Sequence, residues 1–217
     1  VVEVNIQPGD VIVGLASFGK SSYEKEYNSG IGCNGLTSAR HDVLGNEMLK
    51  KYPETFDPMM NNSLIYSGSK KITDMEKETG LPVGKLLLSP TRTFFPVIKK
   101  ILQKNIPVHG IIHCTGGGQT KVLKFAERVR IIKDNLFEPP PIFKLIQNES
   151  GAPWKEMYEV FNMGHRMEIY TLEENADAII DIASGFQINA KRVGYVEPNI
   201  RTELLIKGSF EKIRYQV

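Results

Sequence analysis

Residues 110–129, GIIHCTGGGQTKVLKFAERV, place an apolar run directly before three glycines and a segment with helical spacing. The run VHGIIHC is typical of a buried strand. Apolar residues between Val122 and Val129 then recur three and four positions apart, as on one face of an amphipathic helix. The stretch therefore predicts a strand to residue 114, a glycine loop, and a helix from Thr120 to Val129.

The glycine loop is a candidate anion site. A strand that ends in glycines and enters a helix leaves backbone N–H groups unpaired, and together with the helix dipole they favour a phosphate or carboxylate. His113 would lie beside that anion, where its near-neutral titration suits proton transfer or charge stabilisation. The alternative is a tight turn next to a buried core histidine. The glycine spacing matches neither the Rossmann nor the Walker pattern.

Composition excludes several classes of protein. The 217 residues are 41% apolar, enough to bury a sizeable core, and 27 basic against 25 acidic residues without a long basic block give no indication of nucleic-acid binding. No apolar run approaches the roughly 20 residues that cross a bilayer. Cys33 and Cys114 have no CxxC spacing, which favours a reduced, cytoplasmic compartment over a disulfide. Because residue 1 is not Met, we expect a piece of a longer protein.

Strands and helices are interleaved along the chain without a strict βαβ repeat. Apolar patterns predict strands at 9–17, 108–114, 129–133, 167–171, 188–197 and 203–208. Helical patterns predict helices from Asn34, from Thr93, at 142–149, at 153–161 and after Thr171. We expect the last two strands to pair as a hairpin. The order favours an α+β fold, a mixed β-sheet covered by helices, formed by residues 1–217 as a single domain.

Local signals predict several finer features. Asn34 and Thr91 are candidate N-caps, and Thr171 with Glu174 fits a capping box. The segment 17–35 is predicted to be a long loop that is either functional or mobile. The Lys70–Lys71 pair and the tail FEKIRYQV are predicted to be solvated surface, and Trp154 to pack at a helix start.

HCTGGG, residues 113–118, resembles the H-x-T-G-G-G motif in the C-terminal domain of the phosphoribosylformylglycinamidine cyclo-ligase (aminoimidazole ribonucleotide synthetase) family. Four further segments resemble that family in the same order: PGDVIVGLASFG, CNGLTSAR (family S-N-G-Y-S-L-V-R), LLLSPTRTFF (L-L-x-P-T-R-x-Y) and EMYEVFNMGHRM (E-M-x-R-T-F-N-M-G-x-G-M). The resemblance extends from about Pro8 to Glu197.

The resemblance implies an ATP-dependent ring closure. In this family the formyl oxygen of formylglycinamidine ribonucleotide is phosphorylated, an internal nitrogen attacks that carbon, and phosphate leaves to give aminoimidazole ribonucleotide. ATP and Mg²⁺ are placed mainly on an N-terminal domain, through which the protein forms homodimers. The present chain would be the C-terminal domain, incomplete as a catalyst without that partner domain, with no metal ligands of its own and with no nucleic-acid or membrane partner.

Matching the motifs assigns candidate roles residue by residue. His113 and Arg92 are the predicted catalytic residues. The predicted contacts to phosphate or substrate are Thr115, Gly116, Gly117, Gly118, Asn34, Gly35, Ser17, Thr91, Asn162 and Gly164. Arg92 has the alternative of a surface arginine in the first turn of a helix. For Asn162 and Gly164 a role in turning the backbone is equally consistent with Asn-x-Gly chemistry.

Two positions depart from the family pattern. The family reads G-x-H-S-N-G, whereas this chain carries an insertion, KSSYEKEYNSGIG, and has Gly32 and Cys33 in place of the His and Ser. Ser17, Ser21 or Ser22 are candidates to replace the lost hydroxyl. The second departure is Arg166, which stands where the family favours glycine and is predicted to face solvent.

Rival functions come from the same two-domain superfamily and from a different class. Selenophosphate synthetase and the amidotransferase-coupled formylglycinamidine synthetase share the plan, but the PTR and FNMG segments favour the cyclo-ligase. The other class is a non-catalytic binding or dimerisation module that has lost its ATP half. An upstream coding region rich in glycine and aspartate would favour an enzyme.

Overall fold

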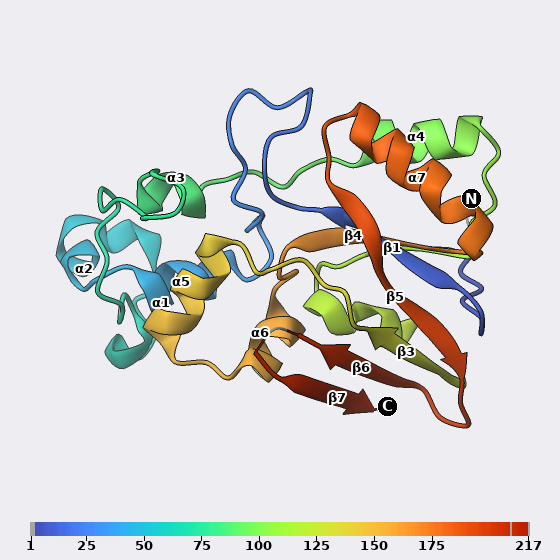
Figure 1. The fold of residues 1–217 in the computed structure, drawn as a ribbon. Helices are drawn as coiled ribbons and strands as arrows, with labels where there is room; N and C mark the ends of the chain where they lie inside the picture. Colours follow the sequence, from blue (N-terminus) through green and yellow to red (C-terminus); the bar gives the residue numbers. More distant parts are fainter. Residues whose placement is uncertain (1–2, 209, 217) are drawn as a thin grey trace.

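A computed structural model describes residues 3–208 and 210–216, and its centre is one mixed seven-stranded sheet (Figure 1). The strands are β1 Val11–Ala16, β2 Gly110–His113, β3 Val129–Lys133, β4 His165–Thr171, β5 Ala190–Pro198, β6 Glu203–Lys207 and β7 Lys212–Gln216. Their order across the sheet is β2-β4-β1-β5-β3-β6-β7. The predicted α+β class is confirmed.

Strand β1 lies in the middle of the sheet between two antiparallel partners. Val13 is opposite Ile169 of β4 and Arg192 of β5. Five of the six residues of β1 are buried, because both faces of the strand are covered. A strand buried on both faces has a continuous apolar sequence rather than an alternating one, which is why the run at 11–16 was readable as a strand.

Two helices cover one face of the sheet. These are α4, Phe95–Gln103, and α7, Glu173–Gly185, which lie beside each other at the upper right of Figure 1. Val13 and Ile169 of the sheet pack against Ile101 of α4 and Ile179 of α7. The spacing of apolar residues predicted both helices, although α4 begins two residues later than expected.

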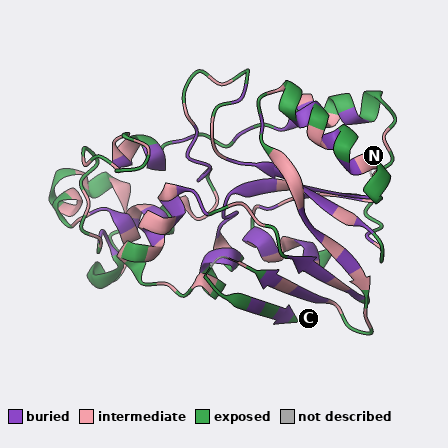
Figure 2. Cartoon of the chain, viewed as in Figure 1, coloured by how far each residue is buried: buried purple, intermediate pink, exposed green. Residues whose placement is uncertain are grey.

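The opposite face is covered by α5, Pro141–Ser150, α6, Trp154–Val160, and the 3₁₀ helix η3, Gly118–Lys124. Its core includes Ile12, Tyr170 and Val193 from the sheet, with Phe143 and Met157 from the helices. Figure 2 shows the neighbouring strands β1 and β4 as largely buried, whereas much of β5 is intermediate and β7 is partly exposed. The two layers leave the carboxyl end of β2 and the glycine loop after it at the rim of the sheet.

The remaining helices gather at one end of the molecule. They are α1 Leu36–Val43, α2 Glu47–Lys51, η1 Pro53–Thr55, η2 Asn62–Leu64 and α3 Val83–Leu87, and α1 packs against α5 and α3 (left in Figure 1). The single helix expected from Asn34 is therefore two helices. Gly35, at φ 74°, occupies the N-cap position of α1, and the Asn34 side chain instead donates a hydrogen bond to the Val160 carbonyl at 2.8 Å.

The C-terminal strands pair differently from the prediction. β3 lies between β5 and β6, parallel to β6, so the expected hairpin is wrong. The tail predicted to be solvated surface forms β7, with Ile213 and Tyr215 buried. Trp154 stacks on Phe210 of this tail at 4.0 Å between ring centroids. β7 forms the edge of the sheet, and only its alternate residues are buried, so the polar residues between them gave the segment the composition of a solvated tail. The last residue of the predicted tail, Val217, lies outside the described residues.

Three local predictions around helices are also wrong. The helix expected at 120–129 is the short 3₁₀ helix η3, because Val129 belongs to β3 and Phe125 is exposed. The capping box is not formed, since the Thr171 hydroxyl donates to the Pro107 carbonyl at 2.7 Å. Thr91 lies before α4 and bonds with Cys33 instead of capping the helix. Across the described residues, none of the helices has the length and apolar character needed to cross a membrane.

Candidate active site

His113 is the last residue of β2, and its half-buried ring lies at a surface cavity beyond the sheet. The cavity is lined by Thr91, Arg92, Thr93, Phe94, Phe95, Ile98, His113 and Met167. The His113 Nε2 atom is buried and has no hydrogen-bond partner among the described residues. Burial lowers the pKa of this imidazole, and the positive charges of Arg166 and Lys121 lower it further. His113 is therefore neutral at neutral pH, with a ring nitrogen available for proton exchange.

The glycine loop follows His113 and has positive φ at all three glycines, 62°, 121° and 47°. Within the described chain, the backbone N–H groups of Gly116 and Gly117 have no hydrogen-bond partner. The Lys121 ammonium lies beside the loop, 3.8 Å from the position that a Gly116 Cβ would take. Free amides next to a cation favour an anionic ligand, as the sequence predicted for this loop. Thr115 is half-buried beside them, and its backbone N–H donates to the His113 carbonyl at 2.7 Å.

Gly118 anchors the loop to the C-terminal end of α6. A Cβ at position 118 would lie 2.5 Å from the Phe161 carbonyl oxygen and 2.6 Å from that of Tyr158. Replacing Gly118 with alanine is therefore expected to lower the free energy of unfolding by at least about 2 kcal/mol, combining steric overlap with left-handed backbone strain. Gly116→Ala is the control, because it has the backbone strain without the overlap and should cost only about 1 kcal/mol. Equal losses in urea denaturation would contradict this account.

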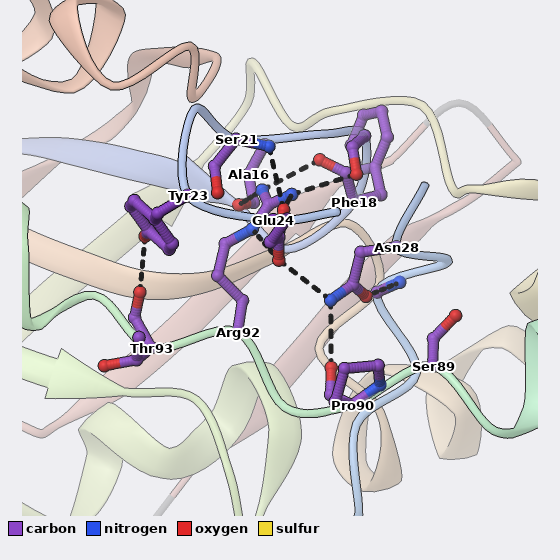
Figure 3. Close-up of polar contacts among 12 residues, drawn as sticks. Ala16, Phe18, Ser21, Tyr23, Glu24, Asn28, Ser89, Pro90, Arg92 and Thr93 are labelled. Atoms are coloured by element: carbon purple, nitrogen blue, oxygen red, sulfur yellow. Dashed lines mark hydrogen bonds and ion pairs between the residues drawn. The ribbon is translucent and has the colours of Figure 1, made fainter. Parts of the chain in front are cut away.

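Arg92 is buried, with 4% of its surface exposed, so the alternative of a surface arginine is wrong. All five guanidinium N–H groups have internal partners: the Ala16, Phe18 and Gly19 carbonyls and both carboxylate oxygens of Glu24 (Figure 3). Burial by itself raises the pKa of Glu24, but hydrogen bonds from Arg92 and Ser21 outweigh it and leave the pKa lowered. Arg92 therefore has no free N–H for a ligand in this arrangement, and it holds the 16–24 loop in place.

The bonds of Arg92 make a conservative substitution costly. Arg92→Lys keeps the charge but supplies three donors instead of five, so two of the acceptors lose their partner. We expect the free energy of unfolding to fall by about 1–3 kcal/mol, measured by urea denaturation. Arg201→Lys, at an exposed position, is the matched control and should change it by less than about 0.5 kcal/mol. A result for Arg92→Lys as small as the control would show that these bonds contribute little.

Asn162 connects the loop at residue 30 to the turn before β4. Its side chain donates to the Gly30 carbonyl at 2.8 Å and accepts from the Ser17 hydroxyl at 2.7 Å and from the Gly164 amide at 3.1 Å. These contacts correspond to the backbone-turning alternative for Asn162 and Gly164. Ser17 is 1% exposed, so its hydroxyl also belongs to this internal network. The Ser21 side chain is buried too, which leaves Ser22 as the exposed hydroxyl of the three candidates.

Three further residues predicted to contact phosphate or substrate, Gly35, Asn34 and Thr91, lie in or next to the 28–35 loop. Gly35 packs against Phe161, whose ring atom would be 2.5 Å from a Cβ at that position. Asn34 is bonded to the same end of α6. Thr91 is exposed on the cavity that contains His113, where its hydroxyl accepts from the Cys33 amide at 3.2 Å. Of the predicted residues, His113, Thr91 and Arg92 thus line one cavity. The contacts of Ser17, Asn162, Gly164, Asn34 and Gly35 are internal, between the 28–35 loop, the end of α6 and the turn before β4.

A buried charged network lies directly beneath the glycine loop. The Lys133 ammonium is 2.5 Å from Glu168 Oε1 and donates to the Gln119 carbonyl and side-chain oxygens at 2.8 and 2.9 Å. Glu168 also accepts from Tyr170 at 2.8 Å and contacts His165 Nε2 at 2.8 Å. Lys133 and Glu168 are both 0% exposed. The network fixes Gln119, and through it the start of η3 next to the glycines.

The network makes the free energy of unfolding depend on pH. Burial alone raises the pKa of Glu168, but Lys133 and His165 outweigh it and bring the pKa to about 2 from 4.5. Its stabilising contribution is therefore complete above pH 4.5 and is lost as the pH falls from 4.5 toward 2. Burial lowers the pKa of His165 below 6.5, so that its contribution also decreases as the pH falls below 6.5. Urea denaturation across this range should show both losses, and Glu168→Gln should remove the one at lower pH.

Cys114, His165 and Glu168 have the spacing of a metal site, with their ligand atoms within 4.8 Å of one another. A cation already occupies this cluster, namely the Lys133 ammonium bound to Glu168. Burial raises the pKa of the Cys114 thiol well above its usual range, with the Glu168 charge adding to it, which disfavours the thiolate that metals bind. The chemistry of this donor set therefore does not fit a metal ion.

Several residues at the site were missed or misplaced by sequence reasoning. Arg166 is 3% exposed and lies beneath the loop, so the expectation that it faces solvent is wrong. Lys121 was not singled out because its segment read as an ordinary amphipathic helix. The buried pair of Lys133 and Glu168 was missed as well. The signal for it in the sequence was a charged residue in an apolar strand, because Lys133 ends VRIIK and Glu168 interrupts the buried run at 165–171.

These features define an α+β fold in which a glycine loop with free amides, a candidate anion site, follows a neutral histidine and lies next to a buried charged network. The family model described as AIR synthase related protein, C-terminal domain, matches residues 7–207, and the chain belongs to this family. The predicted resemblance is thereby confirmed.

Two curated relatives show how much of a longer protein this chain represents. It is 34% identical over 193 residues to phosphoribosylformylglycinamidine cyclo-ligase of Methanopyrus kandleri, covering 89% of this chain and 45% of that protein. With the Methanococcus vannielii protein of the same name the identity is 36% over 208 residues, covering 95% and 48%. The chain thus spans about half the length of the curated relatives it matches. Hydrogenase maturation protein HypE, solved with ATP, shares the fold at a TM-score of 0.53 and 12% identity, over 98% of this chain and 52% of that one.

Proposed function

We propose that this chain is the substrate-side half of an ATP-dependent cyclo-ligase that converts formylglycinamidine ribonucleotide to aminoimidazole ribonucleotide, with release of ADP and phosphate. The observation that carries the proposal is the neutral His113, a residue of the cavity, whose Nε2 has no hydrogen-bond partner among the described residues and which precedes the free amides of the glycine loop by three positions. The names of the relatives support the reaction class.

The ring closure needs a proton acceptor and a stabiliser of negative charge. The attacking nitrogen loses a proton as it bonds to the activated formyl carbon, and the phosphorylated oxygen leaves with its electron pair as phosphate. Neutral His113 is suited to accept that proton through Nε2. The amides of Gly116 and Gly117, with Lys121 beside them, are suited to hold the departing phosphate. Arg92 acts as a positioning residue, since its contacts are all with the protein.

ATP and Mg²⁺ belong to the other half of the protein in this proposal. The carboxylates nearest the site are already engaged, Glu24 by Arg92 and Glu168 by Lys133, so this half offers poor ligands for Mg²⁺. ATP supplies the phosphoryl group that activates the formyl oxygen. The relatives are about twice as long as this chain, which leaves room for an ATP-binding domain. Assembly as a homodimer through that domain, in the cytoplasm, completes the proposal.

The test is turnover by the full-length protein, including the half that precedes this chain in the relatives. With formylglycinamidine ribonucleotide, ATP and Mg²⁺, we expect aminoimidazole ribonucleotide and stoichiometric ADP, while the present chain alone should give neither. Two replacements of the substrate test the rival synthetases. Selenide tests for selenophosphate synthetase, and the amide precursor of formylglycinamidine ribonucleotide, supplied with an ammonia source, tests for formylglycinamidine synthetase. Product formation only with one of these would overturn the proposal, and so would binding of the ribonucleotide without any ATP turnover.

A further inference from the structure

The two departures from the family pattern meet in space. Gly32 stands where the family has a histidine, and Arg166 stands where the family has a glycine. A Cβ at position 32 would lie only 1.9 Å from Arg166 Nη1 and 2.0 Å from Nη2. The guanidinium of Arg166 thus fills the volume that a side chain at position 32 would need. One position has lost its side chain and the other has gained one in the same place.

The bonds of Arg166 leave part of its guanidinium available. Nη2 donates to the carbonyl oxygens of Gly30 and Ile31 at 3.0 and 2.6 Å, which fixes the group beneath the loop. Nε is buried without a partner, and Nη1 makes no hydrogen bond within the described residues. Arg92, by contrast, uses all five of its N–H groups internally. A buried cation with free donors on one side has the form of half an anion site.

Other positive charges lie near Arg166, namely Arg92, which acts on Arg166 itself, and Lys121, which acts on the same histidine ring. The Arg166 and Lys121 charges both act on the His113 ring, and the Cys33 sulfur is within electrostatic range of Arg166. Cys33 is exposed next to Gly32 and contacts Thr91, which lines the cavity of His113. The Arg166 guanidinium therefore lies beneath the 28–35 loop, close enough to His113 for its charge to act on the ring.

We propose that Arg166, whose guanidinium fills the volume over Gly32, binds a phosphate group of the ligand through its Nε and Nη1 donors. The inference rests on the proposed function only for the choice of a phosphate-bearing ligand.

A merely structural role is the competing explanation, because Arg166 also holds the carbonyls of the loop. The two roles differ in what a bound anion does to Cys33, the exposed one of the two cysteines. Iodoacetate and iodoacetamide alkylate the same thiol, but only iodoacetate carries a negative charge. The ratio of their rates at Cys33 therefore measures the local positive charge without any turnover or ATP. Cys114 is buried, and the high pKa of its thiol keeps it unreactive.

The experiment measures this ratio in the chain described here and in Arg166→Gln, Arg166→Lys and the exposed control Arg201→Gln. We expect Arg166→Gln to lower the ratio about threefold, the effect of one unit charge at about 6 Å through water. Arg166→Lys should retain most of the ratio, and Arg201→Gln all of it. Millimolar inorganic phosphate or ribose 5-phosphate should protect Cys33 in the unmodified chain and in Arg201→Gln, and much less in Arg166→Gln.

The outcomes distinguish two sources of the bound phosphate, the ribonucleotide and the transferred group. They also distinguish a failure of this inference from a failure of the proposed ring closure. Better protection by ribose 5-phosphate assigns the site to the phosphoester of the ribonucleotide, and better protection by inorganic phosphate assigns it to the group that is transferred. If neither anion protects, or if protection persists unchanged in Arg166→Gln, the inference is overturned. If Arg166→Gln does not fold, the inference is decided by whether phosphate protects Cys33 of the unmodified chain and by the ratio of the two alkylation rates in Arg166→Lys. Failure of ring closure by the full-length protein would leave these results unaffected.

Discussion

Replacing Lys133 with methionine is expected to lower the free energy of unfolding by roughly 3–5 kcal/mol, because the substitution leaves a buried carboxylate without its counter-charge. Lys133 and Glu168 are fully buried, 2.5 Å apart. The ammonium also satisfies two oxygens of Gln119, and these lose a charged donor in the variant. Methionine preserves most of the volume, so the loss would report the charge and the hydrogen bonds more than a cavity.

Urea denaturation of three variants checks this account. Lys207→Met, at an exposed position of β6, is the control and should change the free energy of unfolding by less than about 0.5 kcal/mol. Lys133→Met combined with Glu168→Gln should recover part of the loss, because the second substitution removes the unpaired charge. A loss below about 1 kcal/mol for Lys133→Met would mean that water or the Tyr170 hydroxyl already compensates the carboxylate.

Replacing His113 with alanine in the full-length enzyme should lower kcat about 100- to 10,000-fold, the range that a positioned acid or base contributes. Stability should change little, because the His113 ring is only half-buried and its Nε2 has no partner to lose. Turnover by the unmodified enzyme should decrease as the pH falls through a pKa below 6.5, since protonation removes the acceptor and the pKa of His113 is lowered. Initial rates of ring closure and urea denaturation of the same samples separate the two effects.

His109→Ala is the matched control for this prediction. His109 precedes the other end of β2 and contacts Asp10 at 2.5 Å, so its loss should affect stability and leave kcat of the folded enzyme unchanged. If His113→Ala retains full turnover, the role assigned to His113 in ring closure is wrong. If kcat and stability fall together, His113 is a core residue, which is the alternative that the sequence left open.

The elements and the site were readable from the sequence to different degrees. The strands β1, β2, β3 and β4 were predicted from short apolar runs, and of these β1, which is covered on both faces, carries an unbroken one. The helix α7 was predicted from its apolar stripe, but its cap was not. The N-cap position of α7 is Leu172, one residue after Thr171, and the Thr171 hydroxyl donates to the carbonyl of a distant segment, that of Pro107. Capping signals are local, whereas the bond that forms depends on which groups the fold brings near.

The sequence by itself determined the α+β class, the family resemblance and the position of the glycine loop after His113, because these depend on residues within a few positions of one another. Only the tertiary structure decided that β3 separates β5 from β6, that Arg92 supports a loop instead of facing a ligand, and that Arg166 fills the space over Gly32. These outcomes depend on contacts between residues that are 61 positions apart, as Lys133 and Gly194 are, to 136 positions apart, as Gly30 and Arg166 are. Which residues contact one another at such distances depends on packing and on the pairing of buried charges, and a local sequence pattern contains no information on either.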